Sequence, residues 1–382
     1  MDATATVGRI ARNAAYGYDG MDGTNGMEGE PPMVDAIVFS SVTKTVLTAD
    51  GPKSLIKDVN LNFEAGGIYG IIGLGGAGKT TLLKLVDHTL TPTSGTISVL
   101  GQDLGALDDR GLAAVQAQIS KVGVFPDFDP DRTILESVAI AAGEDPEAHE
   151  PDEKARAKAF RLLREVSLRS QKDTYPAQLS GGELQRAAVA KAFASDPRIV
   201  LLDEATAAQD HLESLDILRL VQQFAHESNA TVLLATHEIS AVKEICDHIV
   251  VLDRGLVVEE GVTHAVLADP QAAQTRIFTQ SASSLGKVQT LLDGHDPVVD
   301  LRPGQKLISL RYVHEDVSEP LVSLVTRKFG IDVNIMLADV QIVGKYPIGG
   351  IVAVFEGPER NIRDAIAFLR SKKVRVEVLA EN

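Results

Sequence analysis

The feature that most constrains the fold is a glycine-rich turn between a short apolar strand and a helix. Residues 68–72 are largely apolar and indicate a buried strand, whereas residues 80–87 are typical of a helix. The turn between them fits the pattern G-x-x-x-x-G-K-[ST]. Glycines let backbone N–H groups close around phosphates, and the start of the helix favours negative charge. The sequence therefore predicts a phosphate-binding site formed by Gly73, Gly75, Gly76, Ala77, Gly78, Lys79, Thr80 and Thr81.

A second apolar strand places two carboxylates where the phosphate turn needs them. Residues 199–202 are followed directly by Asp203 and Glu204. We expect Lys79 to reach the β- and γ-phosphates of a nucleotide, and the Thr80 hydroxyl to ligate Mg²⁺ together with Asp203. Glu204 is placed to act as the general base on the attacking water. Alone, the acidic pair is equally consistent with a polar strand end, but the phosphate turn favours catalysis.

Composition excludes several other classes of protein. The chain has 37 Lys and Arg against 53 Asp and Glu, a net charge of −16, which argues against a nucleic-acid binder. One cysteine, Cys246, excludes a disulfide scaffold, and we predict it to be a small core residue. The longest apolar runs fall far short of the roughly 20 residues that a membrane-spanning helix needs. The chain is not expected to cross a membrane by itself, although it could dock on a protein that does.

Four segments follow one another along the chain. Residues 1–33 indicate a flexible acidic leader. Residues 34–270 alternate strands and helices, which predicts an α/β domain with a largely parallel sheet. Within it, a charged and proline-broken stretch at about 101–177 indicates a helical insertion. A polar linker is expected at 271–305. Residues 306–382 show the order β-α-β-β-α-β, which predicts a small α+β ferredoxin-like domain.

A further motif indicates the family. Residues 179–186, Leu-Ser-Gly-Gly-Glu-Leu-Gln-Arg, closely match the signature of ATP-binding-cassette (ABC) ATPases. They lie between the phosphate turn and Asp203, as in that family, and Thr236-His237 resembles its histidine switch. Because these motifs occur in the right order, the resemblance is specific. It implies a P-loop ABC ATPase domain that binds ATP and Mg²⁺ and hydrolyses ATP.

The resemblance also implies a homodimer. In the family two cassettes face each other head to tail, and the signature of one chain meets the γ-phosphate held by the other. Here that role would fall to Ser180, Gly181, Gly182 and Glu183. His237 would contact the γ-phosphate and help to order the water. Asp210 matches the loop that joins the two sites.

The last domain narrows the resemblance. A cassette followed by a ferredoxin-like domain is similar to the ATPase subunit of bacterial methionine importers. The tail domain of that family is called NIL after an Asn-Ile-Leu triad, and Asn334-Ile335-Met336 matches it with one substitution. The resemblance implies that methionine binds the tail and inhibits transport, with Asn334 as the candidate ligand. A strand asparagine bonded to neighbouring backbone explains Asn334 at least equally well.

The same resemblance implies partners and a location. Membrane permease subunits would bind the cassette directly, and an extracytoplasmic solute-binding protein would act with them indirectly. The chain would then lie peripherally on the cytoplasmic face of the cell membrane.

Three positions depart from the family pattern. Pro126 stands where the family has a glutamine that contacts Mg²⁺ and senses the membrane partner, with Asp127 beside it as a potential substitute. Val46 stands where an aromatic residue stacks on adenine, and Gln209 replaces a leucine. The phosphate, metal and base residues are intact, so ATP hydrolysis is still expected, even if slow.

Three alternatives to a methionine importer stay open. The cargo could be another small solute, because the ATPase does not touch cargo and a ferredoxin-like fold does not fix a ligand. The chain could be a regulatory protein with weakened ATPase activity, as Pro126 and Val46 suggest. A non-transport ABC protein of DNA repair or translation is disfavoured by the single cassette and the acidity.

Overall fold

The computed structural model describes residues 35–49, 51–143, 151–281, 288, 301–312, 320–344 and 346–382. The expected leader and most of the expected linker lie outside the described residues. The elements run in the order β1 (Asp35–Thr48), β2 (Gly51–Glu64), β3 (Ile68–Ile72), α1 (Lys79–Val86), β4 (Ser94–Val99), β5 (Gln102–Asp103), α2 (Asp109–Gln116), β6 (Ile119–Gly123), α3 (Ile134–Ala142), α4 (Glu153–Glu165), α5 (Gly181–Ala194), β7 (Ile199–Asp203), α6 (His211–Ser228), β8 (Thr231–Thr236), α7 (Ile239–Ile245), β9 (His248–Asp253), β10 (Leu256–Val262), α8 (Thr263–Ala268), α9 (Ala273–Ser281), β11 (Gln305–Tyr312), α11 (Leu321–Phe329), β12 (Asp332–Val343), β13 (Tyr346–Glu356), α12 (Glu359–Ser371) and β14 (Val374–Glu381).

The central element of the cassette is a six-stranded sheet in the order β10-β9-β3-β8-β7-β6. All neighbouring pairs are parallel except β10 with β9. Strands β3 and β8 are buried along their whole length, which explains their continuous apolar sequences, because a parallel sheet is covered on both faces. The α/β class expected from the sequence is confirmed.

The sheet brings three loops of the candidate site to one edge. Ile72 at the end of β3 pairs with Thr236 at the end of β8. Asp203 at the end of β7 pairs with Ala235 of β8. The phosphate turn, the acidic pair and the histidine loop therefore leave the sheet side by side, at the carboxyl ends of adjacent parallel strands.

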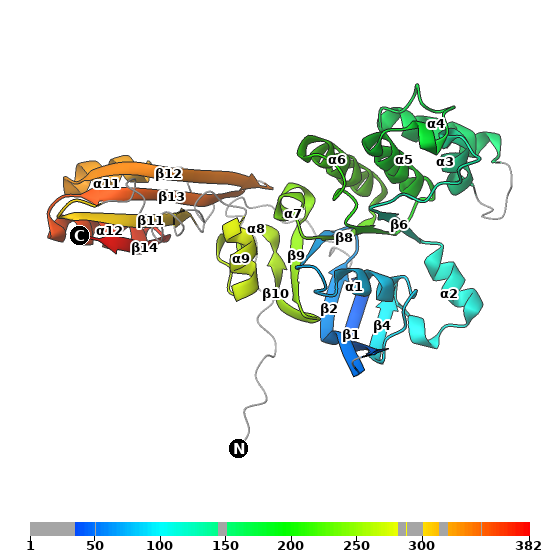
Figure 1. The fold of residues 1–382 in the computed structure, drawn as a ribbon, viewed down its shortest axis with the longest axis horizontal. Coiled ribbons are helices and arrows are strands. Elements are labelled where there is room, and N and C mark those ends of the chain that lie inside the picture. The colour runs from blue at the N-terminus through cyan, green and yellow to red at the C-terminus, as the bar shows by residue number, and fades with distance from the viewer. Residues whose placement is uncertain are drawn as a thin grey trace, which may run out of the picture. The chain divides into compact units, whose positions relative to one another are not determined.

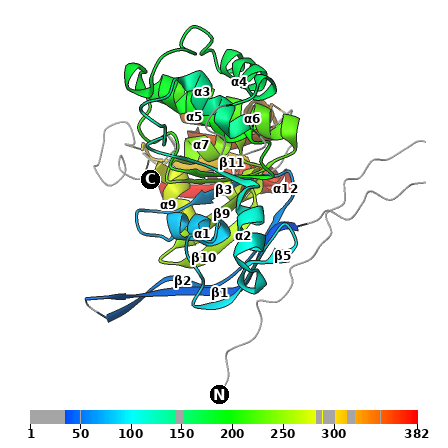
Figure 2. The same cartoon turned by 90° about the vertical axis from the view of Figure 1, so that its right-hand side faces the viewer.

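A smaller antiparallel sheet, β2-β1-β4-β5, covers one face of the six-stranded sheet. Its inward residues, such as Ile37, Phe39 and Phe63, are fully or almost fully buried and share a hydrophobic cluster with Leu82 and Leu85 of α1. Strands β1 and β2 form a long hairpin that extends beyond the rest of this sheet in Figure 2. One side of this hairpin borders the phosphate turn, as described below.

Helices α3, α4, α5 and α6 gather together beside β6 (Figure 1). Their buried residues, among them Val138, Leu163 and Val189, pack with Leu202 and Leu234 in a second hydrophobic cluster. The extent of the predicted helical insertion needs correction, because β6 and the short β5 fall inside 101–177. β6 is an edge strand of the six-stranded sheet, so the group of helices α3, α4 and α5 starts only after it. The prolines at 126 and 130 follow β6 and mark this boundary.

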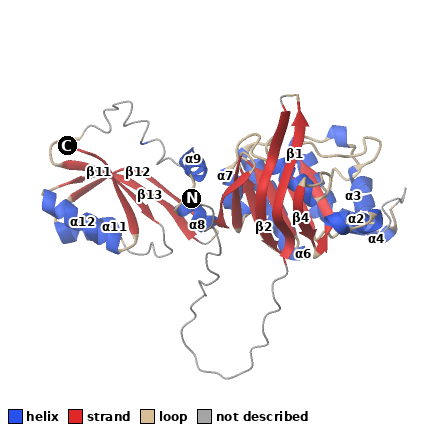
Figure 3. Cartoon of the chain, turned by 90° about the horizontal axis from the view of Figure 1, so that it is seen from below, coloured by secondary structure: helices blue, strands red, loops and turns tan. Residues whose placement is uncertain are grey.

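The last domain has the strand order β12-β13-β11-β14, all antiparallel, with α11 and α12 after the first and third of its strands. This is the ferredoxin-like arrangement predicted from the sequence. Both helices lie on one face of the sheet (Figure 3), where Val325, Ile362 and Leu369 pack on Ile308 and Phe355. The other face has a smaller cluster around Leu307, Val352 and Val354.

The tail contacts the cassette through apolar and polar side chains. Val343 and Ile348 of the tail are buried in the same cluster as the cassette core. Lys243 of α7 donates a hydrogen bond from Nζ to Gln341 Oε1 of β12 at 2.8 Å. The core of the cassette therefore continues into the tail.

Two further pairs join the cassette to the tail. Arg375 of β14 forms an ion pair with Asp269, which follows α8. The rings of His264 and Tyr346 stack with their centroids 3.7 Å apart. Helix α8 is thus flanked by tail contacts at both of its ends.

The described part of the chain contains no helix that is long and apolar enough to span a membrane. Cys246 is buried, as expected, and its sulfur lies in the space that a side chain at Gly70 would need.

Candidate active site

The phosphate turn has an open inner surface formed by backbone. A Cβ at Gly75 or Gly76 would meet no atom within 4 Å, whereas one at Gly78 would lie 2.9 Å from Leu55 O. Gly76 and Gly78 have φ angles of 78° and 114°, which only glycine adopts without strain. Gly78 caps α1 without a side-chain hydrogen bond. The first N–H groups of the helix therefore lack a side-chain cap and face the turn, as phosphate binding requires.

Lys79 is the buried cation of the site. The residue is 7% exposed, and its Nζ donates to Gly73 O at 2.8 Å across the turn. The same ammonium lies 3.1 Å from Glu204 Oε1. A buried charge needs partners of this kind, because desolvation without them is costly. The contact holds the predicted phosphate-binding lysine and the predicted general base together.

Glu204 links the lysine to the histidine switch. Its Oε2 lies 2.7 Å from His237 Nδ1. The residue has a φ of 52°, and its N–H donates to Ala235 O at 2.9 Å. A left-handed glutamate is uncommon, and such strain often marks functional sites. Three loops thus supply one connected group, Lys79–Glu204–His237.

Thr80 and Asp203 form a second polar pair beside this group. The Thr80 hydroxyl donates to Asp203 Oδ1 at 3.0 Å. Burial raises the pKa of Asp203; the Thr80 hydrogen bond opposes this effect, and the charge of Glu204 adds to it. A hydroxyl and a carboxylate are the hard oxygen ligands that Mg²⁺ prefers. The two residues fit the predicted metal site, and a cation there would favour the ionised form of Asp203.

The signature begins at the start of α5. Ser180 Oγ accepts from Glu183 N at 3.3 Å, while Glu183 Oε2 accepts from Ser180 N at 2.9 Å. The backbone N–H of Ser180 is the main reason why the pKa of Glu183 is lowered. Among the described residues no hydrogen bond or ion pair joins Ser180 or Glu183 to the Lys79–Glu204–His237 group. The two halves of the predicted site are thus separately formed within one chain.

Asp210 has a local role that sequence reasoning did not assign. Its carboxylate caps α6 by accepting from Glu213 N at 2.9 Å. The Oε1 atom of Glu213 in turn lies 2.6 Å from the position that a Cβ at Gly182 would occupy. Gln209, which replaces the leucine of the family, lies 3.6 Å from the Cβ position of Gly181. The loop before α6 and the first turn of α6 therefore lie next to the signature glycines.

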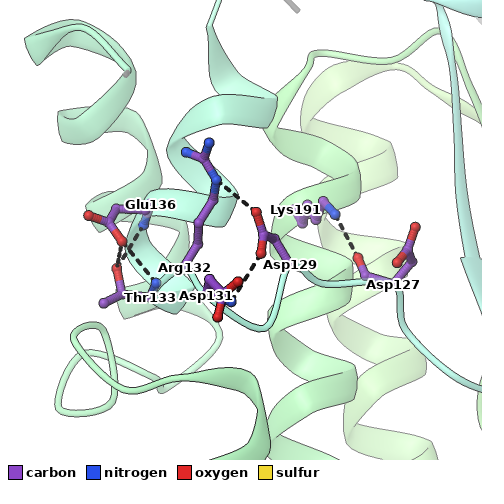
Figure 4. Close-up of polar contacts among 7 residues, drawn as sticks. All are labelled: Asp127, Asp129, Asp131, Arg132, Thr133, Glu136 and Lys191. Atoms are coloured by element: carbon purple, nitrogen blue, oxygen red, sulfur yellow. Dashed lines mark hydrogen bonds and ion pairs between the residues drawn. The ribbon is translucent and has the colours of Figure 1, made fainter. Parts of the chain in front are cut away.

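The loop after β6 is held by the signature helix rather than by the nucleotide site. Lys191 of α5 donates to Asp127 O at 2.7 Å (Figure 4). The Lys191 ammonium also lies over the Phe128 ring, 4.9 Å from its centroid. Asp129 accepts from Asp131 N and from Arg132 Nε, both at 3.0 Å. The backbone N–H of Asp131 is the main cause that lowers the pKa of Asp129.

Asp127 itself contributes its backbone carbonyl to this network, and Figure 4 draws its carboxylate directed away from Lys191. None of the hydrogen bonds recorded for the described residues joins that carboxylate to Asp203, Glu204 or Thr80. The suggestion that Asp127 substitutes for the missing glutamine stays a prediction without a supporting contact.

Gln185 is a residue that sequence reasoning missed. It lies on α5 two positions after Glu183, is fully buried, and donates from Nε2 to Gly123 O at 3.0 Å. Gly123 in turn pairs with Asp203 across β6 and β7. The signature helix is therefore tied to the strand that pairs with β7 at Asp203. The available sequence signal was a polar residue on the otherwise apolar, buried face of α5.

Val46 lies on the β1–β2 hairpin, whose strand β2 borders the phosphate turn. The Cδ1 atom of Ile56 in β2 lies 3.0 Å from the position that a Cβ at Gly78 would occupy. Ile56 pairs with Lys44 of β1. Val46 is two residues further along the same strand and pairs with Lys53 of β2, beyond a register shift between Lys44 and Thr45. This location fits the predicted adenine contact, which an aliphatic side chain makes without stacking.

An aromatic residue at position 46 is expected to strengthen nucleotide binding. Stacking contributes about 0.5–1.5 kcal/mol, so Val46→Tyr should tighten ATP binding roughly 2- to 10-fold, measured by calorimetric titration. Leu47→Tyr is the control, because Leu47 is 88% exposed and points to the opposite face of the strand. Equal affinities of Val46→Tyr and the unmodified chain would remove Val46 from the adenine site.

Comparisons with known proteins agree over both domains. The ABC transporter family model matches residues 56–207, and the NIL domain model matches residues 306–378. The methionine import ATP-binding protein MetN of Photobacterium profundum is 36% identical over 346 residues, covering 90% of this chain and 98% of the relative. The methionine import ATP-binding protein MetN 1 of Enterococcus faecalis is 34% identical over 327 residues, covering 85% of this chain and 90% of the relative.

A solved structure of a cassette resembles a large part of the chain. The dimeric ATP-binding cassette MJ0796 in a post-hydrolysis state, bound to ADP and Pi, has a TM-score of 0.54 and 30% identity. The similarity covers 59% of this chain and 98% of that one.

Proposed function

The chain belongs to the family of methionine-import ATP-binding proteins, and from this premise we propose that it couples ATP hydrolysis to methionine uptake. The family and the cassette fold make it an ABC-type ATPase. The observation that carries the proposal is the connected group Lys79–Glu204–His237 beside the Thr80–Asp203 pair. These five residues belong to loops that leave adjacent strands at one edge of the sheet.

The geometry supports a division of labour among these side chains. The Lys79 ammonium neutralises charge on the phosphates held by the backbone of the turn. Glu204 accepts the proton of the attacking water. The His237 ring, which lies 2.7 Å from the Glu204 carboxylate, orients this water. Thr80 and Asp203 would hold Mg²⁺, whose charge offsets that of the β- and γ-phosphates. In this conformation Lys79 pairs with Glu204, so phosphate binding must draw the ammonium away and release the base.

The proposal includes a homodimer. The γ-phosphate held by the second chain would meet the signature residues Ser180, Gly181 and Gly182. This agrees with the described residues of one chain, among which no hydrogen bond or ion pair joins Ser180 or Glu183 to the Lys79–Glu204–His237 group. The dimeric arrangement of the ATP-binding cassette MJ0796 supports this proposal. Membrane permease subunits are the proposed direct partners and would keep the chain at the cytoplasmic face of the membrane. The loop from Phe125 to Asp131 would meet them, and its Phe125 is 88% exposed.

We also propose that the NIL domain senses methionine and inhibits transport. The match to the NIL model supports the domain assignment, while the ligand follows from the names of the relatives. Asn334 is exposed on β12, and among the described residues the contact given for its Nδ2 is a long one of 3.7 Å to Met336 Sδ. Its side chain is therefore accessible to a ligand.

A regulatory protein with weakened ATPase activity is the second candidate. Pro126 and Val46 favour it, because they replace residues that sense the permease and stack on adenine. Turnover of about 1 per second or faster in the purified chain would count against it.

Methionine uptake should depend on Lys79. Cells whose only copy of the chain carries Lys79→Ala should take up labelled L-methionine at the rate of cells that lack the chain, because the phosphate cation is gone. Lys84→Ala is the matched control, since Lys84 lies exposed on the same helix. Uptake that is normal for methionine but lost for another amino acid would assign a different cargo.

A further inference from the structure

The first turn of the signature helix α5 has two N–H groups without an acceptor inside the helix. Ser180 Oγ accepts from Glu183 N at 3.3 Å, and Ser180 O accepts from Leu184 N at 2.9 Å. The N–H groups of Gly181 and Gly182 precede these bonds, so no carbonyl of the helix lies behind them. The positive end of the helix dipole lies beside the same two groups, which makes them the natural donors for the proposed γ-phosphate contact.

A carboxylate from another helix already lies at this end of α5. A Cβ at Gly182 would be 2.6 Å from Oε1 of Glu213, 2.7 Å from its Cδ and 2.8 Å from its Oε2. The whole carboxylate therefore lies against Gly182, which is buried although Gly181 beside it is exposed. Because the Cα–Cβ bond of a helical residue is tilted toward the N-terminus, this position lies beside the free N–H groups.

The carboxylate of Glu213 differs from that of Glu183 because it lacks hydrogen-bond partners. Glu183 accepts from Ser180 N at 2.9 Å, from Ser180 Oγ at 2.8 Å and from Gln171 Nε2 at 3.0 Å. Among the described residues the Glu213 carboxylate accepts no hydrogen bond and forms no ion pair. The positive end of α5 is therefore placed to stabilise this charge.

The backbone of Glu213 is held in place, whereas its carboxylate is not. Asp210 Oδ1 accepts from Glu213 N at 2.9 Å, and Ser214 Oγ donates to Thr206 O at 3.2 Å. These bonds fix the first turn of α6 beside the signature. The side chain of a glutamate still rotates about three bonds. The carboxylate can therefore leave Gly182 without a change in the backbone.

We propose that Glu213 covers the signature as an internal anion and must be displaced by the γ-phosphate that the second chain presents. A carboxylate and a phosphate at one helix end repel each other, because like charges this close disfavour the charged forms. Glu213 thus opposes the closing of the two chains and sets how much ATP is needed for it. This inference rests on the proposed two-chain site, because it states what lies on the signature before the phosphate arrives.

The test measures the dimer dissociation constant of the full chain with Mg-ATP by sedimentation. Glu204→Gln is the parent, because loss of the general base keeps ATP bound. Adding Glu213→Gln should lower the dissociation constant about 3- to 25-fold, since one charge at a helix end corresponds to about 2- to 5-fold and a dimer has two such sites. Glutamine keeps the size of the side chain and the N–H that Asp210 caps.

The matched control is Glu227→Gln in the same parent. Glu227 is exposed on the last turn of α6, so its variant changes the net charge equally but should leave the dissociation constant unchanged. The gain in Glu213→Gln should also shrink as salt is raised, because the Debye length falls from about 10 Å at 0.1 M to about 3 Å at 1 M. A purely structural effect would not depend on salt in this way. Melting temperatures measured alongside verify that each variant is folded.

The outcomes separate this inference from the proposed function. Equal or weaker dimers in Glu213→Gln would overturn the inference, and so would an equal gain in Glu227→Gln, which would assign the effect to the net charge of −16. A parent that forms no dimer with Mg-ATP would overturn it together with the two-chain site. ATP turnover and methionine uptake by the unmodified chain decide the ATPase and import functions independently.

Discussion

ATP turnover is expected to fall at least about 100-fold in Glu204→Gln, because a positioned general base contributes roughly 10²–10⁴ to the rate. Glutamine keeps the size of the side chain and its contacts with Lys79 and His237, so the fold and the phosphate turn should be retained. ATP affinity should therefore stay within a few-fold of the unmodified chain. Phosphate release measures the first quantity, and titration with ATP measures the second.

The control for this variant is Glu238→Gln. Glu238 lies next to His237 in the chain but makes no side-chain cap to α7, and its loss should leave turnover unchanged. Full turnover in Glu204→Gln would remove Glu204 from the mechanism. Loss of ATP affinity along with turnover would instead mean that the charge of Glu204 maintains the phosphate turn through Lys79.

The second large effect is expected at the signature. Helices α5 and α3 begin with the same capping box: Ser180 with Glu183 on α5, and Thr133 with Glu136 on α3. In both, the glutamate N–H donates to the hydroxyl at 3.3 Å and the hydroxyl donates to the carboxylate at 2.8 Å. Ser180→Ala and Thr133→Ala should therefore each lower the free energy of unfolding by about 1 kcal/mol.

Only the signature variant should affect catalysis. If Ser180 binds the γ-phosphate held by a second chain, Ser180→Ala should lower turnover roughly 10- to 100-fold. This factor corresponds to the free energy of one charge-assisted hydrogen bond. Thr133→Ala should keep normal turnover at equal stability. Titration with ATP at low protein concentration should give the same affinity for both, because the phosphate turn is on the other chain. Equal turnover in the two variants would limit Ser180 to capping its helix.

Much of this site was predictable because its signals are local. The phosphate turn, Asp203 and Glu204 each follow an apolar strand, and parallel strands must end at the same edge of a sheet. The ferredoxin-like order was equally readable, since its helices and strands differ clearly in period. The extent of the helical insertion was misjudged because β6 is short and partly polar, Ile-Ser-Lys-Val-Gly. An edge strand needs apolar residues on fewer sides, so it gives a weaker signal.

Other features depend on long-range contacts that leave no pattern in the sequence. Gln185 is recognisable as a link only once Gly123, 62 positions earlier, is seen to accept its hydrogen bond. Lys191 holds Asp127 across 64 positions in the same way. The pairing of Gly350 with both Arg311 and Asp339 is set by strand register, which the residue order of β13 alone does not specify.

The burial of Val343 and Ile348 in the cassette cluster has a thermodynamic consequence. Each aliphatic side chain of this size stabilises a fold by about 1.5–3 kcal/mol when fully buried. Cassette and tail therefore share roughly 3–6 kcal/mol of stabilisation that neither has alone. Heat or denaturant should unfold the two domains in a single cooperative transition. Separating the two domains would expose apolar surface on each of them.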